Sequence, residues 1–258
     1  MCQIKDPCSR LGQMEGMIRF PKVLMYHSIS QPEVEDDALC TSPERFEAQM
    51  RYLKRHNLRG VSMRELYLAM NAGDTTGLVG VTFDDGYEDF LGAAVPTLEK
   101  LGFSATVYVV AGMLGSENTW EHRGGPRSQL RLLEADGVRE VSQRGMEVGS
   151  HSVTHPRLSG LDSETLGHEV VDSRRMLSDI LNAPVEGFCY PYGDLDGPAV
   201  RAVRAAGYAY AVATKKQVEG GLYDWPRTFV GEKDSPLRLG VKLRVSPILT
   251  RWRRRSLR

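Results

Sequence analysis

Short apolar runs alternate along the chain with longer segments in which apolar residues recur every three or four positions. The runs are typical of buried strands, and the longer segments are typical of helices with one buried face. We predict strands at Lys22–Ser28, Leu78–Phe83, Ser104–Val110, Met146–Ser150, Gly187–Tyr190 and Tyr208–Thr214. We predict helices at Ser42–His56, Met63–Asn71, Phe90–Leu101, Gln129–Gly145 (interrupted at Gly137), Ser163–Asn182 and Pro198–Ala206. This alternation predicts an α/β fold, a distorted barrel of about seven parallel strands surrounded by helices.

The 258 residues contain no internal repeat and no Ser/Gly-rich linker that would divide them. We therefore expect one domain over residues 21–245, with a tail at 1–20 and a second tail at 246–258. The second tail ends in the basic sequence RWRRRSLR, which is typical of a solvated terminus. Contact of this tail with a membrane surface or an anionic polymer is a weaker interpretation.

Composition and charge exclude few classes of function. Lysine and arginine together number 33, as do aspartate and glutamate, so the global charge indicates no nucleic-acid partner. The chain has no apolar run typical of a signal peptide or a membrane span, which predicts a cytoplasmic protein. Its four scattered cysteines fit reduced thiols better than a disulfide framework.

Two clusters of polar residues follow predicted strands, at the edge where α/β barrels keep their catalytic groups. Asp84 and Asp85 are adjacent carboxylates, so one can bind a metal while the other acts on a water, although Asp-Asp-Gly is also a common turn sequence. His151 and His155 lie four residues apart, so both imidazoles can reach one ion if the segment makes a helical turn, although they also fit a pair of surface histidines. Together with Asp85 they form a two-His, one-carboxylate set that leaves positions open for water and substrate, which is typical of a catalytic metal site.

A third cluster, Cys189–Asp194, follows the next strand along the chain. Its Pro-Tyr-Gly sequence can present a backbone N–H and an aromatic wall to a ligand, although alone it indicates no more than an aromatic turn. In this order the three clusters resemble the motifs of the polysaccharide deacetylase family (NodB-homology domain, carbohydrate esterase family four). The matching sequences are Thr82-Phe83-Asp84-Asp85-Gly86, His151-Ser152-x-x-His155 and Tyr190-Pro191-Tyr192-Gly193. The segment Met25-Tyr26-His27-Ser28 is similar to the start of exopolysaccharide-associated members.

The resemblance implies a hydrolase that removes acetyl groups from N-acetylated amino sugars. It implies that Asp84 is the general base and that Asp85, His151 and His155 bind a divalent metal, most commonly Zn²⁺. A metal-bound water of lowered pKa would attack the acetamide, and the backbone N–H of Tyr192 would help to stabilise the oxyanion. The implied partner is a glycan or a glycan precursor that contains N-acetylglucosamine.

The chain departs from the family pattern at two positions. Cys189 stands where many members have an arginine that orients the base, and we predict that Arg227 replaces it, the alternative being a surface arginine. No histidine follows His168, so the usual late catalytic acid is missing. We predict that His27 supplies this acid, the alternative being a histidine that only supports a neighbouring carboxylate.

Several interpretations stay open at this point. Tyr87, Trp120 and Trp225 are candidates for contact with sugar rings, with Trp120 favoured by its place in a Gly-rich loop. The same fold could serve a metal-dependent amidohydrolase of small C–N substrates, or a glycan-binding module without catalysis. The sequence does not indicate an oligomeric state.

Overall fold

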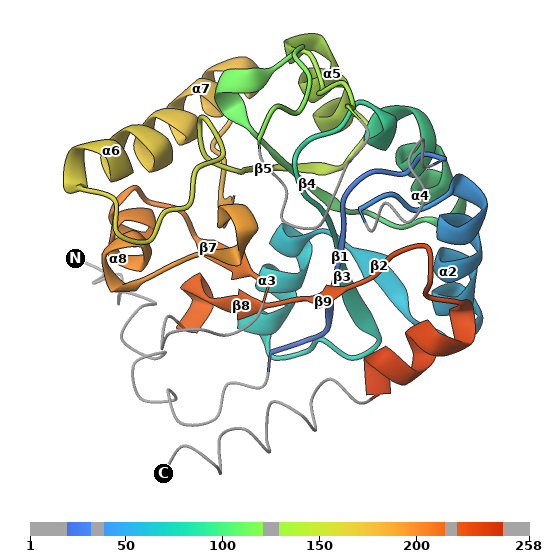
Figure 1. Cartoon of the computed structure of the whole chain (residues 1–258). Coiled ribbons are helices and arrows are strands. Elements are labelled where there is room, and N and C mark those ends of the chain that lie inside the picture. The colour runs from blue at the N-terminus through green and yellow to red at the C-terminus, as the bar shows by residue number, and fades with distance from the viewer. Residues whose placement is uncertain (1–19, 32–38, 121–128, 215–220, 245–258) are drawn as a thin grey trace.

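The computed structural model describes residues 20–31, 39–120, 129–214 and 221–244 (Figure 1). Its strands form one nine-stranded sheet in the order β8-β7-β6-β5-β4-β3-β1-β9, with β2 paired to the start of β3, and every strand pair is parallel. The strands are β1 (Val23–Tyr26), β2 (Arg59–Val61), β3 (Leu78–Phe83), β4 (Thr106–Val109), β5 (Glu147–Ser150), β6 (Gly187–Cys189), β7 (Tyr210–Ala213), β8 (Trp225–Pro226) and β9 (Thr228–Phe229). The predicted barrel of parallel strands is therefore confirmed, with two strands more than expected.

The segment Trp225–Phe229 nearly closes the barrel. Its first two residues, β8, pair with β7, and its last two, β9, pair with β1. Arg227 lies between the two pairings. The sequence analysis missed β2, β8 and β9 because segments of two or three residues are too short to show a period of two.

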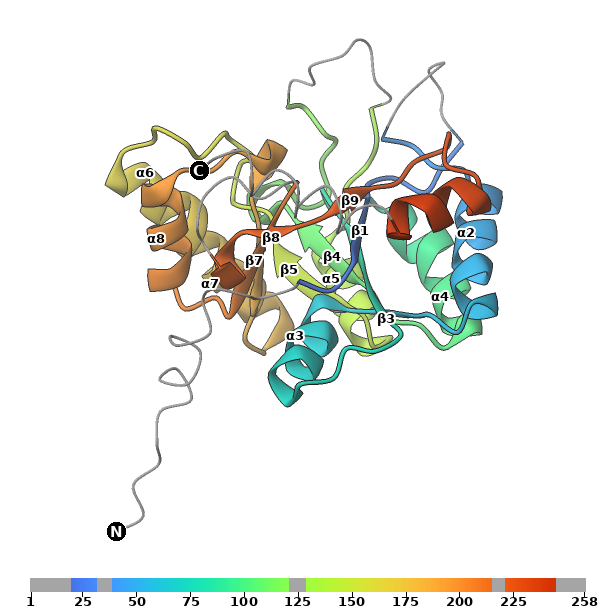
Figure 2. The ribbon, with the colours of Figure 1, turned by 90° about the horizontal axis from the view of Figure 1, so that it is seen from below.

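Helices surround this sheet (Figures 1 and 2). They are α2 (Pro43–Arg55), α3 (Met63–Ala72), η1 and α4 (Phe90–Ala94, Val95–Leu101), α5 (Ala135–Gln143), α6, η3 and α7 (Ser163–Gly167, His168–Asp172, Ser173–Leu181) and α8 (Gly197–Ala205). Short 3₁₀ turns lie at η2 (Ala111–Met113), η4 (Pro191–Gly193) and η5 (Gly221–Tyr223). The helix predicted from Gln129 begins only at Ala135, and Gly137 lies inside it without an interruption. The residues just before it instead form bridges to Glu117 and Tyr87.

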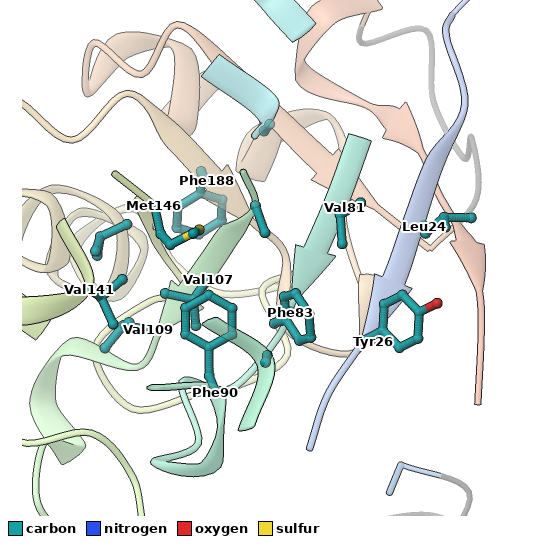
Figure 3. Close-up of a cluster of buried hydrophobic side chains, with 14 of the residues drawn as sticks. Leu24, Tyr26, Val81, Phe83, Phe90, Val107, Val109, Val141, Met146 and Phe188 are labelled. Atoms are coloured by element: carbon teal, nitrogen blue, oxygen red, sulfur yellow. The ribbon is translucent and has the colours of Figure 1, made fainter. Parts of the chain in front are cut away.

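The main hydrophobic core lies between the sheet and the outer helices (Figure 3). Alternate residues of the strands face it, among them Tyr26, Phe83 and Phe188, and apolar side chains of the helices pack against them. Because successive side chains of a strand point to opposite faces, the remaining residues face the inside of the barrel. This inner cluster includes Tyr108 and Tyr210.

Helix α3 lies apart from the surrounding helices, at one end of the barrel (Figure 2). Its buried residues Met63 and Leu66 belong to the inner cluster. Met63 N–H donates to Thr106 Oγ1 (2.7 Å) and Arg64 N–H donates to Glu147 Oε2 (2.7 Å). Thr106 and Glu147 are the first residues of β4 and β5, so α3 closes the amino end of the barrel and leaves the carboxyl end to the site.

The predicted tails lie almost wholly outside the described residues, so the domain boundaries stay a prediction. Within the described residues, no helix combines the length and apolar character needed to cross a membrane. The cellular location predicted from the sequence is likewise untested by the structure.

Candidate active site

The predicted site residues meet at the carboxyl end of the barrel. Asp84 and Asp85 follow β3, and His151 follows β5. His27 follows β1, which pairs with β3 along its whole length. Parallel strands end at one edge of a sheet, so residues that are far apart in the sequence come together there.

Asp85, His151 and His155 bring three ligand atoms to one point. Nε2 of His151 lies 3.3 Å from Asp85 Oδ1, and Nε2 of His155 lies 3.4 Å from the same oxygen. The two Nε2 atoms are 3.3 Å apart. All three side chains are buried, so water does not separate them from one another.

The two histidines are oriented by different means. Nδ1–H of His151 donates to the carbonyl oxygen of Cys189 (2.8 Å), which leaves the lone pair of the neutral ring on Nε2. Among the described residues, Nδ1 of His155 has no hydrogen-bond partner. Its ring instead contacts those of Trp120 and Tyr192, with centroid distances of 4.4 and 4.6 Å.

This cluster fits a divalent cation. Two imidazole nitrogens and a carboxylate oxygen within 3.4 Å would repel one another unless positive charge lies between them. Burial opposes the ionised form of Asp85, but the two imidazoles beside it lower its pKa well below the ordinary value. Two neutral nitrogens and one oxygen are a donor set that Zn²⁺ accepts.

Asp84 forms a buried bidentate ion pair with Arg227. The guanidinium donates from Nη1 to Oδ1 (2.6 Å) and from Nη2 to Oδ2 (2.7 Å). It also donates to Thr82 Oγ1 (3.0 Å) and to the carbonyl oxygen of Ala213 (3.3 Å). Burial alone would raise the pKa of Asp84, but Arg227 lowers it, so the carboxylate stays ionised. Arg227 is therefore not a surface residue, because the β8–β9 link carries it into the barrel.

Cys189 fills the space beside this pair. Its Sγ lies 3.1 Å from Arg227 Nη2 and 3.5 Å from Asp84 Oδ1. The thiol is buried, and burial raises its pKa, so it stays neutral next to the ion pair. A small uncharged side chain at this strand end leaves room for the guanidinium that enters from the β8–β9 link.

His27 faces the same site from the end of β1. Burial lowers its pKa, and the charges of Asp85 and Asp84 oppose that effect. Nδ1 of His27 has no hydrogen-bond partner among the described residues. The next residues are fixed by Asp89, which accepts from Ser28 Oγ (2.6 Å) and from Ile29 N–H (2.9 Å). The sequence analysis missed Asp89, whose only signal is its place five residues after Asp84.

Backbone strain is concentrated at the site. Among the described residues, six non-glycine residues have positive φ, and two of them, Asn57 and Asn182, lie at helix ends where asparagine is well tolerated. The other four belong to the three motifs: Asp85, Ser152, His155 and Tyr192. Conformations of this kind cost of the order of 1–3 kcal/mol each and persist where the surroundings impose them, as they commonly do at functional sites.

The aromatic candidates divide into two groups. Trp225 is fully buried in the inner cluster and Tyr87 is 2% exposed, so neither can face a sugar ring, and that expectation is wrong for both. Trp120 and Tyr192 are partly exposed, and both contact the His155 ring. The guanidinium of Arg157 lies over the Tyr192 ring at 4.3 Å.

The chain is similar to known proteins in sequence and in fold. The family described as polysaccharide deacetylase matches residues 72–211. YxkH of Bacillus subtilis is 27% identical over 213 residues, which cover 82% of this chain and 70% of YxkH. The poly-β-1,6-N-acetyl-D-glucosamine N-deacetylase of Staphylococcus aureus is 22% identical over 195 residues, covering 75% of this chain and 67% of that protein. The structure of the Streptococcus pyogenes deacetylase PplD in complex with acetate has a TM-score of 0.75 and 26% identity, and covers 86% of this chain and 97% of PplD.

Proposed function

Because this chain belongs to the polysaccharide deacetylase family, whose members are hydrolases of carbon–nitrogen bonds, we propose that it removes N-acetyl groups from amino sugars with the help of a divalent metal. The substrate would be a polysaccharide, an oligosaccharide or a glycan precursor that contains N-acetylglucosamine. One observation carries this proposal. The ligand atoms of Asp85, His151 and His155 converge on one point. Beside them lies a second buried carboxylate, Asp84, which is not one of these three ligands.

Two of the related proteins support the substrate class. The name of the Staphylococcus aureus relative specifies a polymer of N-acetyl-D-glucosamine, and PplD was solved with acetate, the acid that N-deacetylation releases.

In the proposed mechanism Asp85, His151 and His155 hold the ion, for which Zn²⁺ is our first choice. When bound, the ion would lower the pKa of a water and polarise the acetamide carbonyl. Asp84 would take the proton of that water as general base. Arg227 keeps Asp84 ionised and fixes both of its oxygens, so the base is oriented before substrate arrives.

Two further groups complete the proposed reaction. The backbone N–H of Tyr192 would donate to the oxyanion of the tetrahedral intermediate, and the left-handed conformation of Tyr192 (φ 58°) sets the direction of this N–H. His27 would protonate the leaving amine. Burial lowers its pKa, so the protonated ring is the minor form at neutral pH, and the acid role depends on that protonated fraction.

The test is acetate release from N-acetylglucosamine oligomers by chelator-treated protein, with and without added Zn²⁺ or Co²⁺. We expect release that depends on metal and that the Asp84→Asn variant lacks. A parallel panel of small amides and ureides separates the deacetylase from an amidohydrolase of small substrates. Stoichiometric metal binding without acetate release from any oligomer would contradict the proposal.

A further inference from the structure

The segment His151–His155 carries both imidazoles but has no regular secondary structure. Ser152 and His155 both have positive φ, 67° and 63°, which side chains other than glycine rarely adopt. Only surrounding contacts can hold such a loop in place. The positions of the two imidazoles therefore depend on what holds this backbone.

Glu169 holds the loop from one side. Its Oε2 accepts from the N–H groups of Val153 (2.8 Å) and Thr154 (2.9 Å), and its Oε1 accepts from Thr154 Oγ1 (2.6 Å). The residue is only 3% exposed. Within the part of the chain that the structure describes, no lysine or arginine pairs with it, so the loop supplies its partners.

The place of Glu169 depends on an irregularity in its helix. It lies in the π-helical segment η3, between α6 and α7. Ser173 Oγ donates to the carbonyl oxygen of Glu169 (2.7 Å) and accepts from Ser150 Oγ (2.8 Å), which ties this segment to the strand end just before His151. Single π-turns inside α-helices are frequent at functional sites.

The η2 turn holds the loop from the opposite side. Ala111 N–H donates to the carbonyl oxygen of Ser152 and Gly112 N–H to that of Val153, both at 2.9 Å. The approach is so close that a Cβ at Gly112 would lie 2.8 Å from the Val153 oxygen. The loop is thus fixed between two rigid elements.

We propose that Glu169 is a positioning residue of the metal site, which holds the His151–His155 loop so that both imidazoles face Asp85 before an ion binds. This inference rests on the proposed function, because it assumes a metal at these ligands. It assigns a role to a residue that touches neither the ion nor the substrate.

The test is the Zn²⁺ dissociation constant, measured by competition with a chromophoric chelator, for wild type and three variants. Glu169→Ala leaves two loop N–H groups unpaired, and we expect affinity to fall by about 10- to 100-fold. Glu169→Asp keeps the charge but is one methylene too short, so it should resemble the alanine variant. Glu169→Gln should stay close to wild type, because its oxygen can accept both N–H groups while its amide donates to Thr154 Oγ1.

The matched control is Glu147→Ala. Glu147 is also 3% exposed and also accepts from a backbone N–H and hydroxyls, but at the amino end of the barrel. This variant should lose stability and keep its Zn²⁺ affinity. Thermal unfolding of the metal-free proteins separates the two effects.

Equal affinities of Glu169→Asp and wild type would overturn the positioning role, as would an equal loss of affinity in Glu147→Ala. Affinity retained by Glu169→Asp and lost by Glu169→Gln would show that charge acts instead of position, and would overturn it too. A wild-type protein that binds no Zn²⁺ would contradict the proposed metal site itself, and this inference with it.

Discussion

The two ends of the barrel both bury carboxylates, but they use them differently. At the amino end, Glu147 accepts from the N–H of Arg64 and from the hydroxyls of Thr106 and Tyr210, and the Arg64 guanidinium lies 3.9 Å from its Oε1, so the protein itself supplies all of these partners. At the carboxyl end, Asp85 faces two imidazole nitrogens whose lone pairs converge on the same oxygen. A carboxylate whose oxygens accept hydrogen bonds from protein donors stabilises the fold. A carboxylate that lies beside other potential ligand atoms is suited to bind a cation.

The pKa shifts follow the same division. Burial raises the pKa of Glu147, and its hydrogen bonds oppose this only in part. Burial acts on Asp84 as well, but the guanidinium of Arg227 more than offsets it and lowers the pKa. The amino end therefore disfavours the charged form of its carboxyl group, and the carboxyl end keeps its carboxylates ionised.

The strongest test of this comparison is Arg227→Met. Without the guanidinium, Asp84 becomes a buried charge with no partner, and we expect the free energy of unfolding to fall by about 3–5 kcal/mol, measured by urea denaturation at pH 7. In wild type the lowered pKa of Asp84 adds stability above the unfolded pKa, which is lost as pH falls through the folded pKa. In the variant, burial raises that pKa, so the deficit should shrink on acidification.

The matched control for Arg227→Met is the double variant Asp84→Asn/Arg227→Met, which removes both charges. It should recover much of the lost stability, because no buried charge is left unpaired. A single variant that loses less than about 1 kcal/mol would show that the pair is solvated like a surface ion pair.

His27→Gln should have the next largest effect. If His27 protonates the leaving amine, its loss should lower kcat by about 10²-fold and leave Zn²⁺ affinity unchanged. A proton donor must be protonated, so wild-type kcat should fall as pH rises through its pKa. Burial lowers that pKa, so the decrease in kcat should be centred below the ordinary histidine pKa of about 6.5. The His27→Gln variant should not show this decrease. An unchanged pH profile would leave His27 with a supporting role only.

The stretches that could be predicted from the sequence are those whose structure depends on local pattern. Leu78–Phe83 is a strand with the predicted bounds, because an apolar run of six residues favours one in any buried setting. Asp84, Asp85 and His151 could be placed at one edge because the ends of parallel strands meet there. Tyr192 adopts positive φ three residues after the end of β6, which its Pro-Tyr-Gly motif alone did not indicate.

Other features depend on how distant segments pair. Arg227 reaches Asp84 because the two halves of the segment that holds it pair with β7 and β1, and no local pattern fixes that register. Glu169 lies on a helix whose periodicity is interrupted by a π-turn, so its direction could not be read from an ideal helix. The site was thus predictable from local pattern where motifs follow strands. Arg227 was predicted only through the family resemblance, and Glu169 was not predicted.

At the amino end, Glu147→Ala should lower the free energy of unfolding by about 1–3 kcal/mol, because it leaves the Arg64 N–H and two hydroxyls without their acceptor. Deacetylation by the folded variant should match wild type.

Glu147→Gln is the sharper control, since it resembles the neutral acid. Because the pKa of Glu147 is raised in the folded state, the free energy of unfolding of wild type should decrease as pH rises from the unfolded pKa through the folded pKa. Glu147→Gln should lack this pH dependence. A loss of activity in either variant at full occupancy of metal would show that the two ends are coupled.

The smallest expected effect concerns the difference between the two histidines. His151 is fixed by a hydrogen bond to the Cys189 carbonyl, whereas His155 relies on ring contacts with Trp120 and Tyr192. An aromatic contact of this kind contributes about 0.5–1.5 kcal/mol, so Trp120→Leu should weaken Zn²⁺ binding by roughly two- to tenfold. Trp120→Phe should keep most of the affinity. If Trp120→Leu instead raised KM for the oligomers without changing Zn²⁺ affinity, Trp120 would contact the sugar and not the metal ligand, and ring packing could not be what orients His155.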